Sequence, residues 1–330
     1  MQKRVLRYLR GWISLRPLLV SLLLLNGCAF NTYRAADTVI ADAHGGGSAL
    51  AISPDSGQLA SAGWGGDIRV WRLPDGAAQT LWQAHHGEVV ALSFLSDRRL
   101  LSAGFDGNLV EWSLRGRKIR SFQADSGVTA LDVDTTGKQA VTGHRDGSVR
   151  LWRLPELSAG EILGSHEGAV RAVAIAPSGD LLASSARDGK VRLWRLDGAF
   201  TTLPDPGSDA RTLQFAPDGR HLYGAGWFDL FRWNLAQRSL VTLDTDHHGI
   251  INSILFDPSG SYLASISRQT DSSVLSLDPA TGKTIQRFQR HSLCGGVVVI
   301  SPDGRTMVTT SDDASVMIWN LAKESLPPSQ

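Results

Sequence analysis

The sequence predicts an all-β fold in which one four-stranded sheet is repeated around a ring. Six of the ten tryptophans are separated by 41, 40, 42, 39 and 86 residues, and the last interval equals two periods of 43. They are Trp71, Trp112, Trp152, Trp194, Trp233 and Trp319. Each ends a short run in which apolar and polar residues alternate, as in a half-buried strand. A period of about 40 residues accommodates four strands and their turns, so the tryptophans mark repeats of a ring-shaped β fold.

Turn-forming residues separate the strands within each repeat. In the fourth repeat, Pro177-Ser178-Gly179 precedes one strand, and Asp188-Gly189 precedes the strand that ends at Trp194. Asp and Gly tolerate the positive φ that tight hairpin turns require. Equivalent proline-containing turns begin at Pro54, Pro217, Pro258 and Pro302. The order of strands and turns therefore predicts consecutive antiparallel hairpins.

These repeats resemble the WD40 repeat, in which a His, a Ser or Thr, an Asp and a Trp of one blade are hydrogen-bonded to one another. Three repeats carry all four residues. The sets are His85, Ser102, Asp106 and Trp112; His166, Ser184, Asp188 and Trp194; and His291, Thr309, Asp313 and Trp319. The resemblance covers roughly Asp37 to Leu321 and implies a β-propeller.

The other four repeats keep only parts of this set. The retained residues are Ser61 and Trp71 in the first repeat, Thr142, Asp146 and Trp152 in the third, Trp233 in the fifth, and His247, Ser265 and Asp271 in the sixth. Gly65 stands at the Asp position of the first repeat, Ala124 at the His position of the third, and Leu277 at the Trp position of the sixth. Leu277 accounts for the double interval between tryptophans, so we expect seven blades.

The two ends of the chain are expected to close the ring. Only eleven residues follow Trp319, and Pro327-Pro328 among them cannot build another strand. The seventh blade therefore lacks its outer strand. Thr38 to Ile40, just before the first blade, is the candidate to supply it, which leaves no open sheet edge. We expect the propeller to span residues 37–321, followed by a tail at residues 322–330.

Residues 1 to 36 do not fit the repeat. Five basic residues, Lys3, Arg4, Arg7, Arg10 and Arg16, precede an apolar run from Leu18 to Leu25 that only Ser21 interrupts. This run is shorter than the ~20 apolar residues of a transmembrane helix, and the order is typical of a secretory signal. Leu25-Asn26-Gly27-Cys28 resembles the lipobox of bacterial lipoproteins, in which the cysteine is acylated and becomes the new N-terminus. An uncleaved signal anchor is the alternative.

The lipoprotein resemblance implies a location for the protein. Residues 1–27 would be the signal peptide, and residues 28–36 a tether that begins at the lipidated Cys28. Each methylene of an acyl chain that enters the bilayer contributes about 0.8 kcal/mol, so several chains anchor durably. Ala29 rather than Asp follows the cysteine, which in this family favours the outer membrane. We therefore expect a propeller on the periplasmic face of the outer membrane.

Charge and cysteine content narrow the class of protein further. Removing residues 1–27 deletes five basic residues and no acidic ones, so the net charge falls from +1 to −4. This balance argues against nucleic-acid binding. Besides Cys28 only Cys294 remains, so no internal disulfide can form, and we expect Cys294 to be buried. We expect a monomeric propeller with protein partners.

The sequence predicts no catalytic residue, metal or cofactor. His44-Gly45-Gly46-Gly47 resembles an esterase oxyanion loop, but the chain has no Gly-x-Ser-x-Gly nucleophile elbow. The glycines fit a loop that enters the first blade. His85-His86 and His247-His248 belong to different blades, and neither pair has a Cys or carboxylate at ligand spacing.

A propeller enzyme of the lactonase or quinone-dependent dehydrogenase type is the alternative function. Such enzymes usually line the central channel with carboxylates or histidines around a metal. Val89-Val90-Ala91-Leu92 and Val170-Arg171-Ala172-Val173, expected in inner strands, are mostly apolar. We therefore expect a non-enzymatic protein.

One narrow face of the ring is the expected partner-binding surface. WD40 domains commonly bind there through the residue before each turn Asp and through one residue of each inner strand. Carried over to this chain, these places hold Arg145, Arg171, Arg187, Arg211, Trp64 and Phe105. Arginines on neighbouring blades can bind acidic groups, and exposed aromatic side chains can anchor a partner. The alternative is that these are solvated loop residues. We expect a scaffold that organises or assembles an envelope protein complex.

Overall fold

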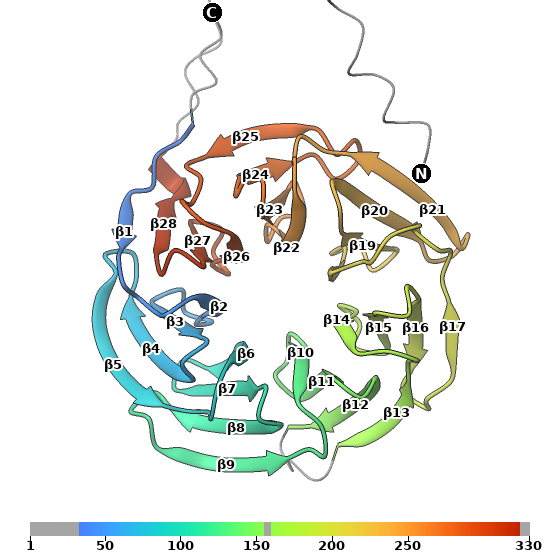
Figure 1. The fold of residues 1–330 in the computed structure, drawn as a ribbon, viewed down its shortest axis with the longest axis horizontal. Helices are drawn as coiled ribbons and strands as arrows, with labels where there is room; N and C mark the ends of the chain where they lie inside the picture. The colour runs from blue at the N-terminus through green and yellow to red at the C-terminus, as the bar shows by residue number, and fades with distance from the viewer. Residues whose placement is uncertain (1–32, 155–159, 324–330) are drawn as a thin grey trace, which may run out of the picture. The chain divides into compact units, whose positions relative to one another are not determined.

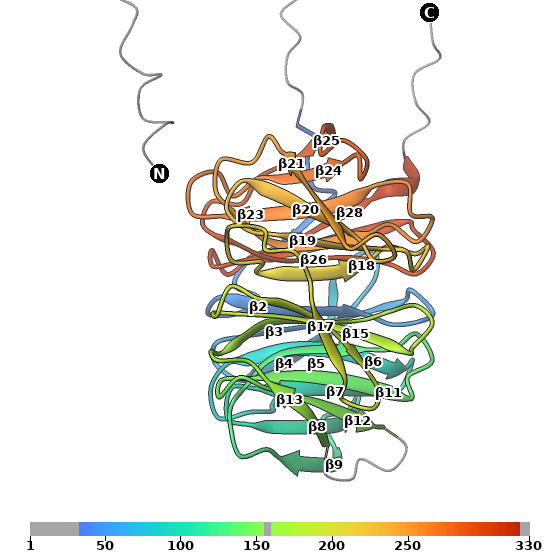
Figure 2. The same ribbon diagram turned by 90° about the vertical axis from the view of Figure 1, so that its right-hand side faces the viewer.

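The computed structural model describes residues 33–154 and 160–323, and these form a ring of seven four-stranded antiparallel sheets around a central channel (Figure 1). The predicted all-β, seven-bladed propeller is therefore confirmed. The blades follow one another around the ring in chain order (Figure 1), and Figure 2 shows the same ring from its side. The innermost strands of neighbouring blades contact each other around the whole channel.

Within each blade the strands follow one another outward from the channel in chain order, except that β1 completes blade seven. Blade one is β2 (Gly47–Ile52), β3 (Gln58–Gly63), β4 (Asp67–Arg72) and β5 (Ala77–Gln83); blade two is β6 (Val89–Ser96), β7 (Arg99–Gly104), β8 (Asn108–Ser113) and β9 (Lys118–Gln123). Blade three is β10 (Val128–Val133), β11 (Gln139–His144), β12 (Ser148–Arg153) and β13 (Glu161–Ser165); blade four is β14 (Val170–Ile175), β15 (Leu181–Ala186), β16 (Val191–Arg195) and β17 (Phe200–Thr202). Blade five is β18 (Thr212–Phe215), β19 (His221–Ala225), β20 (Asp229–Asn234) and β21 (Ser239–Asp244); blade six is β22 (Ile250–Phe256), β23 (Leu263–Arg268), β24 (Val274–Leu277) and β25 (Thr284–Phe288). Blade seven is β26 (Gly295–Ile300), β27 (Thr306–Ser311), β28 (Val316–Asn320) and β1 (Thr38–Ile40), and the short 3₁₀ helix η2 (Leu321–Lys323) follows β28.

Large and small apolar side chains interlock between neighbouring blades. Ala60 and Ala62 of blade one share a core cluster with Leu92 and Trp112 of blade two. The small alanine side chains leave room for the indole of the neighbouring blade. A buried tryptophan removes about 150 to 250 Å² from water, or roughly 4 to 6 kcal/mol of gross transfer free energy. These contacts fix the spacing of the blades around the ring.

The turn between the second and third strands of every blade contains at least one residue with positive φ. Blades one to four use glycine there, as in Gly107 (φ 84°) and Gly189 (φ 75°). Glycine adopts this conformation without the clash that a Cβ atom causes. Blades five to seven instead place Phe228, Ser272 and Ala314 at φ 64°, 45° and 65°. In the last three blades, residues with a Cβ atom therefore adopt a left-handed backbone conformation that is unfavourable for them.

The predicted closure strand is confirmed. β1 pairs antiparallel with β28, with Thr38 opposite Ile318 and Ile40 opposite Val316. Val39 is 49% exposed, whereas Ile40 is half-buried and packs against the cluster that contains Trp71 and Ile318. β1 thus covers the edge of β28 and completes the seventh blade as a four-stranded sheet.

The residues just before β1 also lie against the ring. Arg34 forms a parallel bridge with Phe288 of blade six, and its Nη2 donates to the carbonyl of Asn320 at 2.5 Å. The backbone N–H of Asp37 donates to the carbonyl of Ile318 at 2.9 Å. Part of the segment expected to be a tether is therefore attached to blades six and seven.

Some sequence-based expectations fall on parts of the chain that the structure leaves undescribed. The proposed signal peptide and Cys28 lie outside the described residues, as do residues 324–330 of the tail. Within the described ranges, no helix has the length and apolar character needed to cross a membrane. Cys294 is half-buried, which differs from the buried position expected for it.

Candidate functional site

A chain of hydrogen bonds joins the His, Ser, Asp and Trp of blade two. Trp112 Nε1 donates to Ser102 Oγ at 2.8 Å, His85 Nε2 lies 2.6 Å from the same Oγ, and His85 Nδ1 lies 3.0 Å from Asp106 Oδ1. A carboxylate can only accept, so Nδ1–H donates to Asp106 and Nε2 accepts the Ser102 hydroxyl. Every polar group is then satisfied with a neutral imidazole. The set connects the loop before β6 to the turn before β8.

The electrostatics of this set follow from its burial. Burial lowers the pKa of His85, although the neighbouring Asp106 opposes that shift. Burial alone would raise the pKa of Asp106, but hydrogen bonds to its carboxylate from Asn108 and His86 leave that pKa lowered. The structure therefore favours a neutral histidine beside an ionised aspartate. This state is suited to holding two loops together.

Blade four repeats this geometry, whereas blade seven departs from it. His166 Nε2 lies 2.7 Å from Ser184 Oγ, Trp194 donates to the same Oγ at 2.7 Å, and His166 Nδ1 lies 3.0 Å from Asp188 Oδ2. In blade seven, His291 contacts Thr309 at 2.8 Å and Asp313 at 3.4 Å. Trp319, however, donates to the carbonyl of Arg34 at 3.2 Å. The expected closed set of four is therefore open at Trp319.

Blade one has a histidine and an aspartate that the sequence analysis missed. His44 Nε2 lies 2.7 Å from Ser61 Oγ, which also accepts from Trp71 Nε1 at 2.7 Å. Asp67 Oδ2 lies 3.2 Å from His44 Nδ1, so Asp67 takes the place expected for Gly65. The signal was present, because His44 precedes Ser61 by 17 residues, as His85 precedes Ser102. His44 is thus part of the blade core and not merely of an entering loop.

Blade three finds its histidine in an unexpected place. Ala124 occupies the usual position and is buried. His144, at the end of β11, instead contacts Thr142 Oγ1 at 2.8 Å, and its Nδ1 donates to the carbonyl of Ser126 at 3.1 Å. Trp152 donates to Thr142 at 2.7 Å. Residues two apart on a strand share a face, which lets His144 replace the missing loop histidine.

Blades five and six keep the fold with other contacts. Gly224 aligns with the serine of the other blades, and the Trp233 indole donates to the carbonyl of Pro204 at 2.8 Å instead. In blade six, His247 contacts Ser265 at 2.8 Å and Ser273 at 2.9 Å, while Asp271 Oδ2 lies 3.6 Å from His247 Nδ1. Leu277 pairs with Leu263 as Trp112 pairs with Leu100. The seven blades predicted from the spacing of the tryptophans are therefore confirmed.

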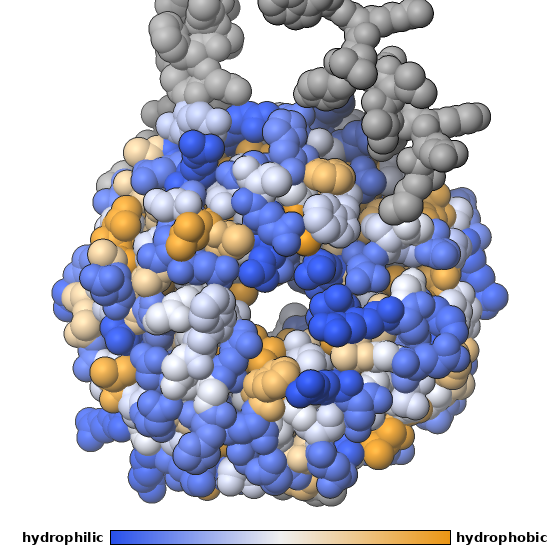
Figure 3. Space-filling model, in the orientation of Figure 1, coloured by the Kyte–Doolittle hydropathy of each residue, from blue (hydrophilic) through white to orange (hydrophobic). Residues whose placement is uncertain are grey.

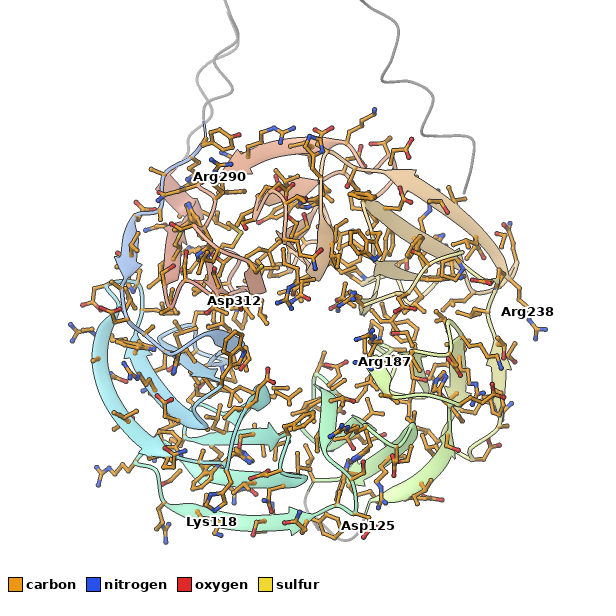
Figure 4. All side chains as sticks on the ribbon, viewed as in Figure 1. Lys118, Asp125, Arg187, Arg238, Arg290 and Asp312 are labelled. Atoms are coloured by element: carbon orange, nitrogen blue, oxygen red, sulfur yellow. The ribbon has the colours of Figure 1, made fainter. Side chains whose placement is uncertain are left out.

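Three turns and the innermost strand β14 bring four of the predicted partner-binding residues together. Phe105, Arg145, Arg171 and Arg187 line one pocket of about 460 Å³, with Thr129, Ala169 and Val170 completing its wall. We call this the arginine pocket. It lies between blades two and four, beside the central opening, where strongly hydrophilic residues surround the channel mouth (Figures 3 and 4).

The three arginines of the pocket differ in their partners. Arg171 Nη2 lies 3.3 Å from Asp209 Oδ2. The Arg145 guanidinium carbon lies 5.5 Å from the centre of the Phe105 ring, a distance at which a cation and an aromatic face attract. Arg145 and Arg187 are both exposed, and neither has a carboxylate oxygen within ion-pair distance among the described residues. Two cations are therefore free to bind an anion.

Arg211 adjoins the pocket from blade five. Burial lowers the pKa of Arg211, and the nearby positive charges of Arg171, Arg268 and Arg187 lower it further, while Asp209 opposes them. The Nε atoms of Arg171 and Arg211 are buried without a hydrogen-bond partner among the described residues. The channel mouth on this side therefore carries positive charge that one carboxylate only partly compensates.

Trp64 lies apart from this cluster. It is 50% exposed, and its indole covers Gly46, where an added Cβ would lie 2.7 Å from the ring. Among the described residues that line the arginine pocket and the channel, Trp64 is absent. The structure thus joins Phe105 but not Trp64 to the arginines.

The sequence analysis missed charged and aromatic residues elsewhere on this face. Arg268 lies 3.3 Å from Asp312, and burial raises the pKa of both Glu88 and Asp312, which flank it. Figure 4 places Arg187 and Asp312 on opposite sides of the central opening. Trp227 and Phe228, whose ring centres lie 5.6 Å apart and whose planes are tilted by 54°, occupy the turn of blade five. Trp227 and Asp312 stand just before the turn position and could have been found by extending that rule to blades five and seven.

The channel holds one carboxyl group with an unusual environment. Burial raises the pKa of Asp132 to about 6, although its carboxylate accepts the backbone N–H groups of Ile175 and Val133 at 2.8 and 2.9 Å. These bonds tie β10 to β14. Across residues 33–154 and 160–323, no group of three or more His, Cys, Asp or Glu side chains is arranged to hold a metal.

Comparison with known proteins agrees with this architecture. The WD40 family model (WD domain, G-beta repeat) matches residues 38–72, 77–113, 116–153, 160–195 and 282–320, more than half of the chain. The unmatched stretch contains most of blades five and six, which lack the full set of four residues. Each match begins near the outer strand of one blade and ends just after the tryptophan of the next blade. The first match accordingly begins at β1, the outer strand of blade seven.

Several curated proteins resemble the chain over part of their length. Methylosome protein WDR77 of Xenopus laevis is 30% identical over 129 residues, which are 36% of this chain and 39% of that protein. SIR4-interacting protein SIF2 of Saccharomyces cerevisiae is 25% identical over 136 residues, 40% of this chain and 25% of that protein. Telomerase protein component 1 of Rattus norvegicus is 29% identical over 287 residues, 82% of this chain but 9% of that protein. The chain thus spans less than half the length of each of these relatives.

The repeat period, the seven sheets and the hydrogen-bonded His, Ser or Thr and Trp of several blades all agree with the five matched repeats. The chain belongs to the WD40 repeat family.

Proposed function

We propose that this chain is a lipid-anchored scaffold of the bacterial envelope, which binds a protein partner through the arginine pocket and organises or helps assemble a complex there. The observation that carries the proposal is the uncompensated positive charge of Arg145 and Arg187 beside the exposed ring of Phe105. Arginine binds carboxylates through two parallel hydrogen bonds, and aromatic side chains are frequent anchors of interfaces.

The similarity to other WD40 proteins supports a role in protein interaction. The name of the yeast relative describes it as interacting with another protein, and that of the Xenopus laevis relative as part of the methylosome. A rigid ring that presents loops on one face suits recognition, because loops vary while the scaffold keeps their positions. The identity of the partner does not follow from these relatives, so we define it by chemistry as an acidic protein surface.

The membrane anchor rests on the sequence. The basic leader, the apolar run and the Leu-Asn-Gly-Cys ending support acylation of Cys28, and Ala29 supports the outer membrane. With residues 1–27 removed, the net charge of −4 would make a basic pocket a local exception on the protein surface. A propeller enzyme stays the alternative, and metal analysis of the purified protein distinguishes the two.

A recovery experiment tests the scaffold proposal. The tagged full-length chain, wild type or Arg171→Glu with Arg187→Glu, is purified from detergent-solubilised envelope, and co-purifying proteins are quantified at low and high salt. We expect the double variant to lose the partner and the wild type to release it as salt rises, because charged hydrogen bonds contribute about 1.5 to 3 kcal/mol each.

The matched control is Arg153→Glu with Arg238→Glu. It makes the same change in charge at two exposed positions, and Figure 4 shows Arg238 at the outer circumference, away from the channel mouth. Thermal unfolding must show that both double variants are folded. Partner recovery equal to wild type from the pocket variant, with unchanged salt sensitivity, would contradict the proposal.

A further inference from the structure

We propose that the arginine pocket binds a short peptide segment in which an Asp or Glu side chain lies next to a bulky apolar side chain. The inference rests on the proposed function, since it specifies the part of the partner that enters the pocket. It follows from the size of the pocket, its two kinds of wall, and the polar groups that its wall leaves without partners.

The size of the pocket limits what can enter it. A volume of about 460 Å³ lies within the range of roughly 300 to 1,000 Å³ that is usual for small-ligand sites. Such a space admits a few side chains and excludes the flat surface of a folded domain. The partner must therefore present a segment that projects from its surface.

The two kinds of wall require a ligand with two kinds of side chain. Arg145 and Arg187 supply positive charge, whereas Ala169 and the 43% exposed ring of Phe105 supply apolar surface. An inorganic anion would leave the apolar surface in water, and an apolar peptide would leave the cations without an acceptor. A carboxylate beside a large apolar side chain satisfies both walls.

Polar groups in the wall also favour an anion. Thr129 Oγ1 and Arg171 Nε are buried without a hydrogen-bond partner among the described residues. A buried donor without a partner is unfavourable, and a carboxylate that enters the pocket is an acceptor of the kind that both groups lack.

The opposite side of the channel mouth sets the direction of the segment. Asp312, across the central opening from Arg187 (Figure 4), would repel a peptide carboxylate, although Arg268 lies 3.3 Å from it. The acidic residue is therefore directed to blades three and four. A basic residue further along the same segment could reach the acidic side, as charge complementarity across an interface requires.

A peptide library displayed on phage tests this inference. Random dodecapeptides are selected on the detergent-solubilised full-length protein, and the best binder is synthesised with capped ends. We expect selected sequences to carry Asp or Glu within two positions of Phe, Trp, Leu or Met. We expect the dissociation constant of the capped peptide to rise about tenfold or more in Arg145→Gln with Arg187→Gln, and in Phe105→Ala.

Two comparisons separate direct contact from general damage. Replacing the peptide Glu or Asp by its amide should weaken binding to wild type but cause little further loss on Arg145→Gln with Arg187→Gln, because the two changes remove the same interaction. Arg238→Gln, which lies at the outer circumference (Figure 4), should bind as wild type. Thermal unfolding of each variant reports whether it is folded.

The outcomes distinguish this inference from the scaffold proposal. Selected peptides without acidic residues, a failure to select any, or equal binding to the Arg145→Gln and Arg187→Gln variant would overturn the peptide assignment. If the envelope partner is still lost from Arg171→Glu with Arg187→Glu, the scaffold proposal stands without it. If the partner is retained there while the peptide needs the pocket, the scaffold proposal fails.

Discussion

The indole of Trp319 donates a hydrogen bond to the carbonyl oxygen of Arg34, at 3.2 Å, across 285 residues of sequence. The last blade tryptophan thus holds the segment that precedes the first blade. Asn320 adds a second contact, since its N–H donates to Asp37 Oδ2 at 2.8 Å and its carbonyl accepts from Arg34. These bonds make the start of the ring depend on its end.

Deleting residues 37–41 should therefore weaken the whole propeller. The deletion removes β1, exposes the edge of β28 and removes a partner of Asn320. We expect a loss of at least about 2 kcal/mol in the free energy of unfolding, because several buried backbone groups lose partners. Denaturant unfolding measures it. Val39→Thr is the control, since Val39 is half exposed; unchanged stability of the deletion variant would rule out a structural role for β1.

Cys28→Ser tests the membrane anchor. Without the thiol no acyl chain can be attached, so we expect a soluble or unprocessed protein in place of one that fractionates with the outer membrane. Labelling with radioactive palmitate and membrane fractionation measure the change. Cys294→Ser should remain lipidated and membrane-bound. A Cys28→Ser protein that is cleaved and still fractionates with the outer membrane would contradict the anchor.

Stability should fall as the pH is lowered from 7.5 to 5.5. Burial lowers the pKa of His44, His85, His144, His166 and His291 below the ordinary value. Below about pH 6.5 these histidines therefore bind more protons in the unfolded chain than in the folded one, and their contribution to stability is lost until the folded pKa values are reached. The raised pKa of Asp132 opposes part of this fall, but it is one group against five. Melting temperatures at several pH values measure this slope. A flat profile over that range would show that these histidines titrate normally.

A pair of variants isolates the contribution of one histidine to that slope. His85→Gln should unfold at a lower temperature at pH 7.5, because Ser102 and Asp106 lose their shared partner. Its melting temperature should also vary less with pH than that of wild type. His86→Gln, at the exposed neighbouring position, should keep the slope of wild type.

Ala314→Gly should stabilise the protein. Ala314 has a φ of 65°, at the position where Gly189 has 75° in blade four. A Cβ in this region costs roughly 1 to 2 kcal/mol, and glycine loses part of that gain to its greater freedom in the unfolded chain. We expect a net gain of about 0.5 to 1 kcal/mol, measured by denaturant unfolding. Gly189→Ala should lose a similar amount, since an added Cβ there meets no atom within 4 Å.

The regular parts of this fold were predictable because they depend on local spacing. The spacing of the tryptophans and the Asp-Gly turns predict seven blades. They also predict correctly that Leu277 stands at the tryptophan position of blade six. The contacts in blades one and three were harder, because Asp67 and His144 reach their partners from neighbouring strand positions. Asp67 and His144 thus make the usual hydrogen-bonded contacts from positions that do not match the spacing of the repeat in the sequence.

The candidate site was predictable only in part, for a related reason. The position just before each turn Asp correctly predicts that Phe105, Arg145 and Arg187 share one face, because this position is equivalent in every blade. It could not show that Arg171 is partly held by Asp209, or that Arg268 lies beside an acidic pair. Those relationships cross blades, and their distances depend on the packing of side chains around the channel.

Closure by β1 also constrains the order in which the protein can be completed. Blades one to six consist of contiguous chain and can form as it is synthesised, but the seventh needs a strand made at the beginning and three made at the end. An emerging chain must keep Thr38 to Ile40 unpaired until β28 has been released, a wait of nearly the whole synthesis. A chain truncated before Trp319 would lack most of β28, and β1 would then have no strand to pair with. A premature stop there therefore leaves an open sheet edge that chaperones or proteases can recognise.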